Sequence, residues 1–534
     1  RIDGFDWTIS YLYDNHGNRK NVVYPGGGSL WYQPNALGQP QRVGVFATSI
    51  SFHPNGLYKS VTLKNGCVNT QTLHTSGYPN IQRSICDTSN IVYNQYSYDG
   101  NGNITFWDDK QSNTYDLRLT YDGLDRLDNI RNGNNSLIGD LNYDSLGNIE
   151  KFDSIAGTIN YTYDANERLY STSGMRAYTF TYDDRGNVED NGFDSFTYNL
   201  ANEMRSASGN SYVYDGHGKR VKAVDSEGTR YSMYSLSGQL LYERINGAYR
   251  QNYYLGSQLI AHQGAGEQTF IHPDILGTTA GKTNSDGGLI KPLRYAPFGL
   301  EWGKTNASSG EDEIGYTGHK HDKSIGLTYM QARYYDPVIG RFYSNDPVDV
   351  FGHAQLEAET GFVHGFNRYS YVGNNPYKYT DPTGECRSNN GNSSNDCPVV
   401  EESFPESGTE ATIVEVNVAF GAAVSLEAGV VKDSQGNKGL QLSVQYGGGT
   451  PEASIEAGKE VTSAESISEL NGASGTQTVG GGEGAVASVS GIVAPTYKGG
   501  SITGGLGAGL PAGTSGGVEH TLVIPLPTQK KKSK

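Results

Sequence analysis

The chain has 534 residues, more than one hydrophobic core normally holds, so we expect at least two structural units. Tyr (38 residues) and Gly (71 residues) are abundant, whereas Met and Trp occur four times each, which favours β-sheet with many turns over helix. The formal net charge of −16 argues against nucleic-acid binding by the main body, because an acidic surface repels phosphate.

The first part of the chain repeats a short motif. The motif begins with an aromatic residue or Leu, which is followed by any residue and then by Tyr-Asp. In the complete copies Gly occurs three positions after the Asp. The second aromatic residue recurs at positions 98, 121, 143, 163, 182, 198 and 214, a spacing of 16 to 23 residues that fits two short strands and two turns. The copies are Tyr11–Asn18, Tyr96–Asn103, Leu119–Asp122, Leu141–Asn148, Tyr161–Asp164, Phe180–Asn187, Phe196–Tyr198 and Tyr212–Gly218.

Each repeat predicts a β-hairpin. Side chains alternate along a strand, so the rings of Tyr96 and Tyr98 are expected on one face. Asp99 starts the turn by accepting hydrogen bonds from the backbone that follows. Gly102 supplies the left-handed conformation that ends a type I turn with a bulge. A lone hairpin is marginally stable in water, so the hairpins are expected to stack side by side.

The repeats fade near Tyr254, and a different set of aromatic, Pro-rich and Gly-rich motifs follows. These motifs predict short strands and tight turns over 267–385, with a brief helix near 353–360. They are His272–Gly277, Tyr295–Gly299, Ala332–Pro337, Gly340–Phe342, Asn345–Pro347, Asn374–Pro376 and Asp381–Gly384.

The composition changes again after Glu385. Residues 386–410 are rich in Asn, Ser and Gly and are interpreted as a linker. Residues 411–527 are Gly-rich with clear strand alternation and predict a second all-β unit, a small sandwich or barrel. Residues 528–534 are interpreted as a basic, solubilising tail. The second unit has one His (His520) and no Arg after Arg387, which is poor material for a nuclease or deaminase.

The four cysteines form two pairs that are local in sequence, Cys67 with Cys86 and Cys386 with Cys397. Two local disulfides would suit an exported protein, and four reduced thiols are the alternative. No CxxC motif and no His cluster accompanies the cysteines, so no metal site is expected there.

His319 and His321, which are followed by Asp322, are candidate metal ligands. Alternate spacing would place both rings on one face of a strand. Because no third His lies near in sequence, we interpret the segment as a surface turn.

These motifs resemble a known family. The Tyr-Asp hairpins resemble YD (Rhs) repeats, and the motifs from Ala332 to Gly384 look like the Rhs repeat-associated core domain. The resemblance covers about residues 1–385 and implies an all-β fold. In it, residues 1–266 form a β-sheet strip that spirals into a shell or cocoon, and the core at 267–385 closes the shell or winds inside it. Closing a long sheet would also remove exposed edges that invite aggregation.

The resemblance implies a function as well. In bacterial members the shell commonly encloses a variable C-terminal toxin, and teneurins use a related shell for cell-surface adhesion. We therefore expect a secreted or cell-surface bacterial scaffold that encapsulates or presents the effector-like unit at 411–527. An adhesin-like protein that recognises glycans or neighbouring cells is the alternative.

The same resemblance implies partners and a location. The partners would be an immunity protein or secretion apparatus, or a cell-surface glycan or receptor, and no cofactor is expected. Because the sequence starts at Arg1 without a signal peptide, we interpret the chain as a fragment and expect its export signal upstream.

Self-cleavage near the end of the core is attributed in related toxins to a pair of aspartates in Asp-Pro motifs. The matching positions here are Asp346 and Asp381, and two carboxyl groups sharing one proton can act as acid and base on a peptide bond. The sequence departs from that pattern at Asp349, where Gly is expected, and at Glu385, where Leu is usual. Asp-Pro-x-Gly is also a turn signature in its own right. We therefore expect the chain to stay whole, with self-processing as the alternative.

Overall fold

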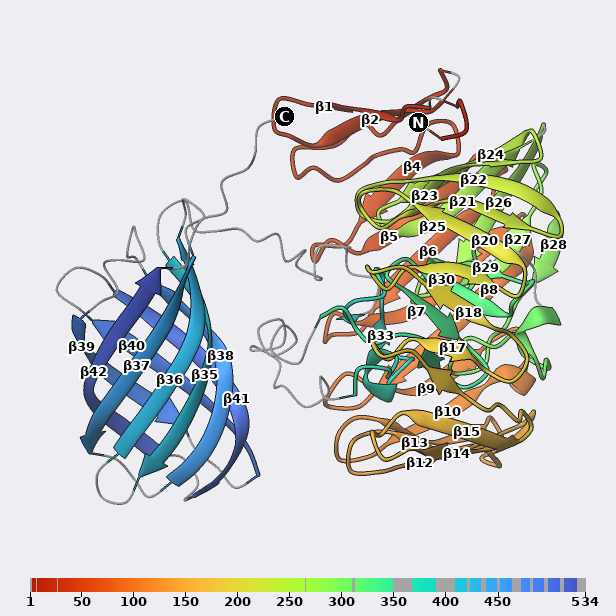
Figure 1. Ribbon diagram of the computed structural model, residues 1–534. Coiled ribbons are helices and arrows are strands. Elements are labelled where there is room, and N and C mark those ends of the chain that lie inside the picture. Colours follow the sequence, from red (N-terminus) through yellow and green to blue (C-terminus); the bar gives the residue numbers. More distant parts are fainter. Residues whose placement is uncertain are drawn as a thin grey trace. The chain divides into compact units, whose positions relative to one another are not determined.

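The computed structural model divides the chain into two compact units (Figure 1). The first comprises Arg1–Val348 with Phe366–Cys397, and the second Asp349–Gly365 with Pro398–Lys534. The structure describes residues 2–5, 7–25, 27–264, 266–309, 313–348 and 367–389, and the backbone of eight strands between 409 and 525. The helix predicted near 353–360, most of the linker at 386–410 and the tail at 528–534 lie outside the described residues.

Two large antiparallel sheets, each with its strands in chain order, make up most of the first unit. The 12-stranded sheet contains β4 (Ala47–Phe52), β5 (Tyr58–Leu63), β6 (Val68–Leu73), β7 (Pro79–Cys86), β8 (Ser89–Tyr98), β9 (Ile104–Asp109), β10 (Leu117–Tyr121), β11 (Leu127–Asn132), β12 (Leu137–Tyr143), β13 (Ile149–Ser154), β14 (Gly157–Tyr163) and β15 (Leu169–Gly174). The 11-stranded sheet contains β18 (Phe196–Tyr198), β19 (Met204–Ala207), β20 (Asn210–Tyr214), β21 (Arg220–Asp225), β22 (Gly228–Tyr234), β23 (Leu240–Ile245), β24 (Ala248–Leu255), β25 (Gln258–Gly264), β26 (Glu267–Pro273), β27 (Thr279–Thr283) and β28 (Leu289–Pro292).

Smaller sheets and short 3-10 helices complete the first unit. The sheets are β1 (Ser10–Tyr13), β2 (Arg19–Val23) and β3 (Ser29–Trp31); β16 (Thr181–Tyr182) and β17 (Val188–Asp190); β29 (Lys320–Asp322), β30 (Leu327–Met330), β31 (Arg333–Asp336) and β32 (Arg341–Phe342); and β33 (Tyr379–Thr380) with β34 (Ser388–Asn389). The 3-10 helices are η1 (Asn113–Tyr115), η2 (Ala307–Ser309), η3 (Tyr316–Gly318) and η4 (Val372–Asn374). In the described part of the chain no helix is long and apolar enough to cross a membrane.

The repeats form the predicted hairpins. Asp99 Oδ1 accepts the backbone N–H groups of Asn101 and Asn103 at 2.9 Å each, and Gly102 has a φ of +81°. The register between β8 and β9 shifts by one residue at Tyr98, which is the predicted bulge. The turn also accepts residues other than Gly, although the left-handed region is unfavourable for them. Asp125 (φ +60°), Glu167 (+59°) and Asn202 (+59°) occupy the corresponding position in other repeats.

Tyrosine hydroxyls join successive repeats in a ladder. The Tyr143 hydroxyl donates to the carbonyl of Leu127 in the preceding hairpin at 2.6 Å, and the Tyr163 hydroxyl donates to the carbonyl of Ile149 at 2.8 Å. Burial raises the pKa of Tyr163 to about 12, so this hydroxyl stays a donor at physiological pH. Tyr98, Tyr121 and Tyr182 make the same contact with the hairpin before them. Each repeat is therefore tied to its neighbour by side chains as well as by strand pairing.

The strip of hairpins bends back on itself between the two large sheets. β8 contacts β27, and the hydroxyls of Tyr24 and Tyr58 donate to the carbonyls of Asn252 (2.9 Å) and Leu255 (2.7 Å). The beginning of the first sheet therefore faces the end of the second sheet. Side chains of both sheets share one buried cluster there, including Val61, Leu63, Ile91, Leu259 and Phe270.

The segment predicted as the core packs against both sheets in a second cluster. Phe298 is 1% exposed, and Tyr335 and Tyr371 are fully buried. The same cluster contains Tyr96, Leu119 and Phe152 of the first sheet with Phe196 and Tyr212 of the second. The apolar faces of these repeats are therefore covered by the chain's own core segment, while β26 to β28 extend the sheet that contains the last repeats.

The second unit is a closed antiparallel barrel, so the predicted choice between sandwich and barrel is settled in favour of the barrel. Its strand order is β35-β36-β37-β42-β39-β40-β41-β38. The strands are β35 (Thr409–Ala419), β36 (Ala423–Asp433), β37 (Lys438–Gly448), β38 (Glu452–Thr462), β39 (Gly472–Gly480), β40 (Gly484–Val493), β41 (Lys498–Gly509) and β42 (Gly513–Pro525).

Candidate functional site

A buried arginine stands at the centre of the site where the core segment ends. Arg333, on β31, is 3% exposed, and its guanidinium lies 2.7 Å from a carboxylate oxygen of Asp346 and 3.1 Å from one of Asp381. The guanidinium also donates to the carbonyls of Arg368 and Gly384. The structure thus brings together the two aspartates that the family resemblance singles out, and it places a shared cation between them.

Asp381 organises the last turn before the linker. Its Oδ1 accepts the backbone N–H groups of Gly384 (2.8 Å), Glu385 (3.0 Å) and Cys386 (3.2 Å). Gly384 has a φ of +76°, and a Cβ atom at this position would lie 2.0 Å from the carbonyl oxygen of Met330. The tight approach of the two backbone segments therefore requires glycine.

The peptide bond between Gly384 and Glu385 is held from both sides. Its carbonyl accepts a hydrogen bond from Arg333 Nε, and its N–H donates to Asp381 Oδ1. A polarised carbonyl with a carboxyl group at the amide nitrogen and a second carboxylate nearby are the components of acid–base chemistry on a peptide. The same contacts also describe an aspartate-initiated turn, in which Oδ1 is occupied by three backbone donors.

One carboxyl group of the site, that of Asp381, has a pKa close to neutral pH. Burial raises the pKa of Asp381 to about 6, Arg333 acts in the opposite direction, and the neighbouring Asp346 adds to the rise. Burial also raises the pKa of Glu385, and Lys219 acts against this rise. Two carboxyl groups with raised pKa, Asp381 and Glu385, therefore lie at the Gly384–Glu385 peptide bond, where Glu385 replaces the Leu that is usual in the cleaving pattern.

His319 and His321 do not form a surface turn, and that prediction is wrong. His319 is 6% exposed and its Nε2 lies 2.8 Å from the carbonyl oxygen of Asp381, while His321 lies in β29 with Nε2 2.9 Å from the carbonyl oxygen of Ala307. Burial lowers the pKa of His319 to about 4, so this ring is neutral at physiological pH. The Asp322 carboxylate forms a buried ion pair with Arg220. Each group of the candidate metal set therefore has another partner.

The structure joins Cys67 and Cys86 in a disulfide, with Cα atoms 4.1 Å apart. The buried His272 lies beside this bond and contacts Asn69 and Thr283 through its two ring nitrogens. Cys386 is also in a disulfide, and the partner that the sequence predicts for it, Cys397, lies outside the described residues.

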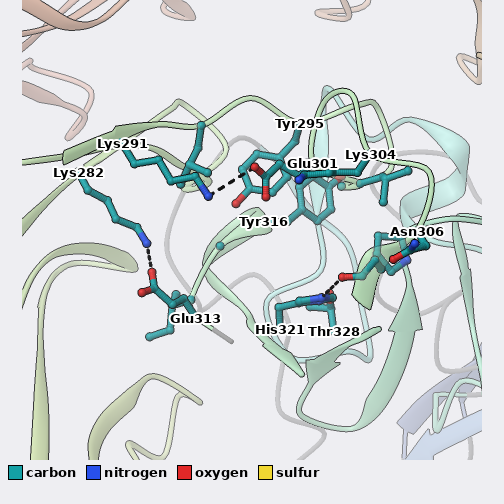
Figure 2. A pocket seen from close by; sticks show the side chains of 17 residues that line it. Lys282, Lys291, Tyr295, Glu301, Lys304, Asn306, Glu313, Tyr316, His321 and Thr328 are labelled. Atoms are coloured by element: carbon teal, nitrogen blue, oxygen red, sulfur yellow. Dashed lines mark hydrogen bonds and ion pairs between the residues drawn. The ribbon is translucent and has the colours of Figure 1, made fainter. Parts of the chain in front are cut away.

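A polar cavity of about 50 Å³ lies between the end of the second sheet and the core segment (Figure 2). Figure 2 shows two ion pairs in its wall, Lys282 with Glu313 and Lys291 with Glu301. Lys304 also lines this cavity, so its wall contains three lysines and two glutamates, of which four residues are joined in these two pairs.

Sequence reasoning did not assign a role to Arg333, although it lies in the motif Ala332–Pro337. The available signal was its position directly before two tyrosines, Tyr334 and Tyr335, in a segment expected to be buried, where a cation needs an anion as partner. The identity of the two partners depends on contacts over 13 and 48 positions of sequence, which no local pattern specifies.

A comparison with family models finds the Teneurin YD-shell family at residues 132–254 and 252–377. This span contains the later hairpins and most of the core segment that packs on them. The matched residues, a little under half of the chain, form a YD-repeat shell of this kind. The described residues between 2 and 389, called the YD shell below, have the hairpin architecture that the motif predicts.

Solved structures give the same fold. The crystal structure of TcdB2-TccC3 matches 71% of this chain and 22% of its own chain with a TM-score of 0.56 and 18% identity. The structure of the Photorhabdus luminescens Tc holotoxin pore matches 72% of this chain and 21% of its own chain with a TM-score of 0.54 and 17% identity.

Curated relatives include a nuclease, a teneurin and a toxin subunit. The tRNA3(Ser)-specific nuclease WapA of Bacillus spizizenii is 26% identical over 262 residues, 45% of this chain. Teneurin-1 of Gallus gallus is 26% identical over 316 residues, 57% of this chain. The toxin subunit YenC2 of Yersinia entomophaga is 27% identical over 199 residues, 33% of this chain. The matches span 11% of the nuclease, 11% of the teneurin and 19% of the toxin subunit.

Proposed function

We propose that the YD shell carries the C-terminal barrel as a covalently attached, effector-like unit of a secreted or surface-exposed toxin system. One observation carries the proposal: the chain is fixed inside the shell immediately before the linker. Arg333 binds both aspartates and the carbonyl of Gly384, while Asp381 holds three successive N–H groups. The chain therefore enters the linker from a segment that buried hydrogen bonds and ion pairs hold in place.

The apolar faces of the repeats are covered by the core segment, because Tyr335 and Tyr371 belong to the same buried cluster as Phe152 and Tyr212. Close-packed side chains of the described residues fill the space between those faces. In this proposal the shell encapsulates or presents the barrel, and an immunity protein or a secretion apparatus is the expected partner.

An exported protein also agrees with the bond between Cys67 and Cys86, since such bonds persist in oxidising compartments. The relatives from toxin systems support the same setting, although each matches this chain over a small part of its own length.

A time course of the purified full chain on a denaturing gel tests whether the barrel stays attached. We expect a single band over days at pH 6 to 8, because Asp381 Oδ1 is occupied by backbone donors and Glu385 replaces the usual Leu. The competing self-processing function predicts a shell of about 385 residues and a tail of about 149, by division of the chain at Glu385. Accumulation of both fragments, abolished by Asp346→Asn or Asp381→Asn, would replace the carrier proposal with self-processing.

A further inference from the structure

A cavity of about 60 Å³ with an aromatic wall lies between the first sheet and the core segment. Its lining includes two of the four tryptophans of the chain, Trp107 on β9 and Trp302. Two tyrosines, Tyr115 of η1 and Tyr377, which follows η4, stand beside them in the wall. Four segments that are distant in sequence thus each contribute a large ring.

The rings meet in two corners. Tyr115 and Trp302 have centroids 5.7 Å apart and planes at 84°, and Trp107 and Tyr377 have centroids 5.9 Å apart and planes at 67°. In a near-perpendicular pair the face of one ring meets the edge of the other, so the two planes form adjacent walls. Aromatic faces carry negative electrostatic potential, which attracts cations.

At pH 8, above the pKa of about 7 to which burial raises Asp274, the charged groups of the cavity leave an excess of one negative charge. Asp109 is neutralised by Arg294, whose Nε donates to its carboxylate at 2.6 Å. Asp274 is 7% exposed, and its Oδ1 accepts the backbone N–H groups of Leu276 and Thr278 at 2.9 Å each. These donors are neutral, so the charge of Asp274 is not matched by a cation of its own. A buried carboxylate in this position favours a positively charged ligand.

We propose that this cavity binds a small organic cation of the quaternary-ammonium class. Aromatic corners beside a buried carboxylate supply both attractions that such a cation requires. The volume accepts about four to six non-hydrogen atoms, taking roughly 10–15 Å³ for each water-sized group, which suits a trimethylammonium head.

Other ligand classes fit less well. An anion would meet Asp274 and the negative faces of the rings. An apolar molecule would displace water from Asp274 without supplying a compensating charge or hydrogen bond. A compact inorganic cation would lose its hydration shell against a wall in which oxygens of Asp109 and Asp274 already accept hydrogen bonds from Arg294 and the backbone. The inference is independent of the carrier function, because the cavity wall contains neither Arg333 nor its two aspartate partners.

The test uses the full chain with its disulfides intact at pH 8 and constant ionic strength. Choline is titrated by calorimetry and by tryptophan fluorescence, and its neutral isostere 3,3-dimethyl-1-butanol serves as the matched probe. We expect choline and tetramethylammonium to bind and to change the fluorescence, with the isostere at least about tenfold weaker. Methyl glucoside is titrated as well, as a neutral sugar. Equal binding of choline and the isostere, or binding of methyl glucoside without binding of choline, would overturn the proposal. So would the absence of choline binding.

Variants locate the site. Trp302→Ala and Asp274→Asn should each weaken choline binding by about tenfold, and Trp302→Phe should weaken it less than Trp302→Ala. Trp31→Phe is the matched control, because Trp31 is 47% exposed and lies outside the cavity. Its affinity for choline should equal that of the parent chain. Unchanged choline binding in both Asp274→Asn and Trp302→Phe, with cooperative thermal unfolding showing that both variants are folded, would place the ligand elsewhere and overturn the assignment.

Discussion

Replacement of Arg333 by Met should destabilise the YD shell by about 3–5 kcal/mol at pH 8, the usual effect of breaking a buried ion pair from one side. Arg333 is 3% exposed and faces two carboxylates that are also almost fully buried, Asp346 at 5% and Asp381 at 2%. Met keeps much of the apolar stem but leaves both carboxylates without their shared cation. The loss therefore comes mainly from uncompensated charge.

The pH dependence of this variant follows from the same charges. The folded pKa of Asp381, about 6, is above its ordinary value of 3.8, so ionisation disfavours the folded state and stability falls as pH rises from about 4 to 6. That difference corresponds to about 3 kcal/mol at most. Without Arg333 the folded pKa should rise further. The destabilisation by Arg333→Met should therefore be smaller at pH 5 than at pH 8.

Urea unfolding followed by tryptophan fluorescence at the two pH values measures these differences. Arg168→Met is the matched control, because its ion pair with Asp164 is partly exposed and should contribute less than about 1 kcal/mol. Adding Asp346→Asn and Asp381→Asn to Arg333→Met should restore most of the lost stability. A loss below about 1 kcal/mol for Arg333→Met, or no recovery in the triple variant, would refute the charge-based explanation.

Three further predictions concern other parts of the shell. Tyr143→Phe removes the donor to the Leu127 carbonyl and should lower the free energy of unfolding by about 1 kcal/mol, whereas Tyr170→Phe, at an exposed ring, should leave it unchanged in the same urea titration. Mass spectrometry of the native, alkylated protein should find Cys67 linked to Cys86, and Cys67→Ser with Cys86→Ser should cost about 3 kcal/mol; alkylated Cys67 and Cys86 would contradict this. Asp274→Asn should stabilise the chain by up to about 4 kcal/mol at pH 8 and by little at pH 4, because burial raises the pKa of Asp274 to about 7. Among the charged groups that act on Asp274 only Arg294 lowers this pKa, and the nearby Tyr96 and Tyr377 are neutral. Equal stabilisation at both pH values would contradict this prediction.

Local features of the shell were predictable because they depend on a few adjacent residues. The turn at Asp99 and Gly102 follows from a side-chain acceptor and a residue that tolerates positive φ, and both occur as expected. The tyrosine ladder was not predicted, because the hydroxyl of Tyr143 reaches a carbonyl 16 positions away in the preceding hairpin. A motif shows that a Tyr recurs, but it does not show where the phenol oxygen points.

Features that depend on the bend of the strip could not be read from local patterns. His319 has the polar neighbours of a surface turn, yet it is buried because the core segment packs against the repeats. The proximity of Asp346 and Asp381 was expected only from the family resemblance, and Arg333 between them was not expected at all. Sequence patterns alone do not show which buried charges meet when distant segments pack together.

The carrier function is tested most directly by separating the barrel from the shell. Residues 386–534 and residues 1–385 would be expressed separately in the bacterial cytoplasm and in the periplasm, and growth would be measured alongside confirmation that each fragment is soluble. The account predicts that residues 386–534 arrest growth in at least one compartment while residues 1–385 have no effect. Normal growth with soluble residues 386–534 in both compartments would contradict the claim that the shell carries an effector.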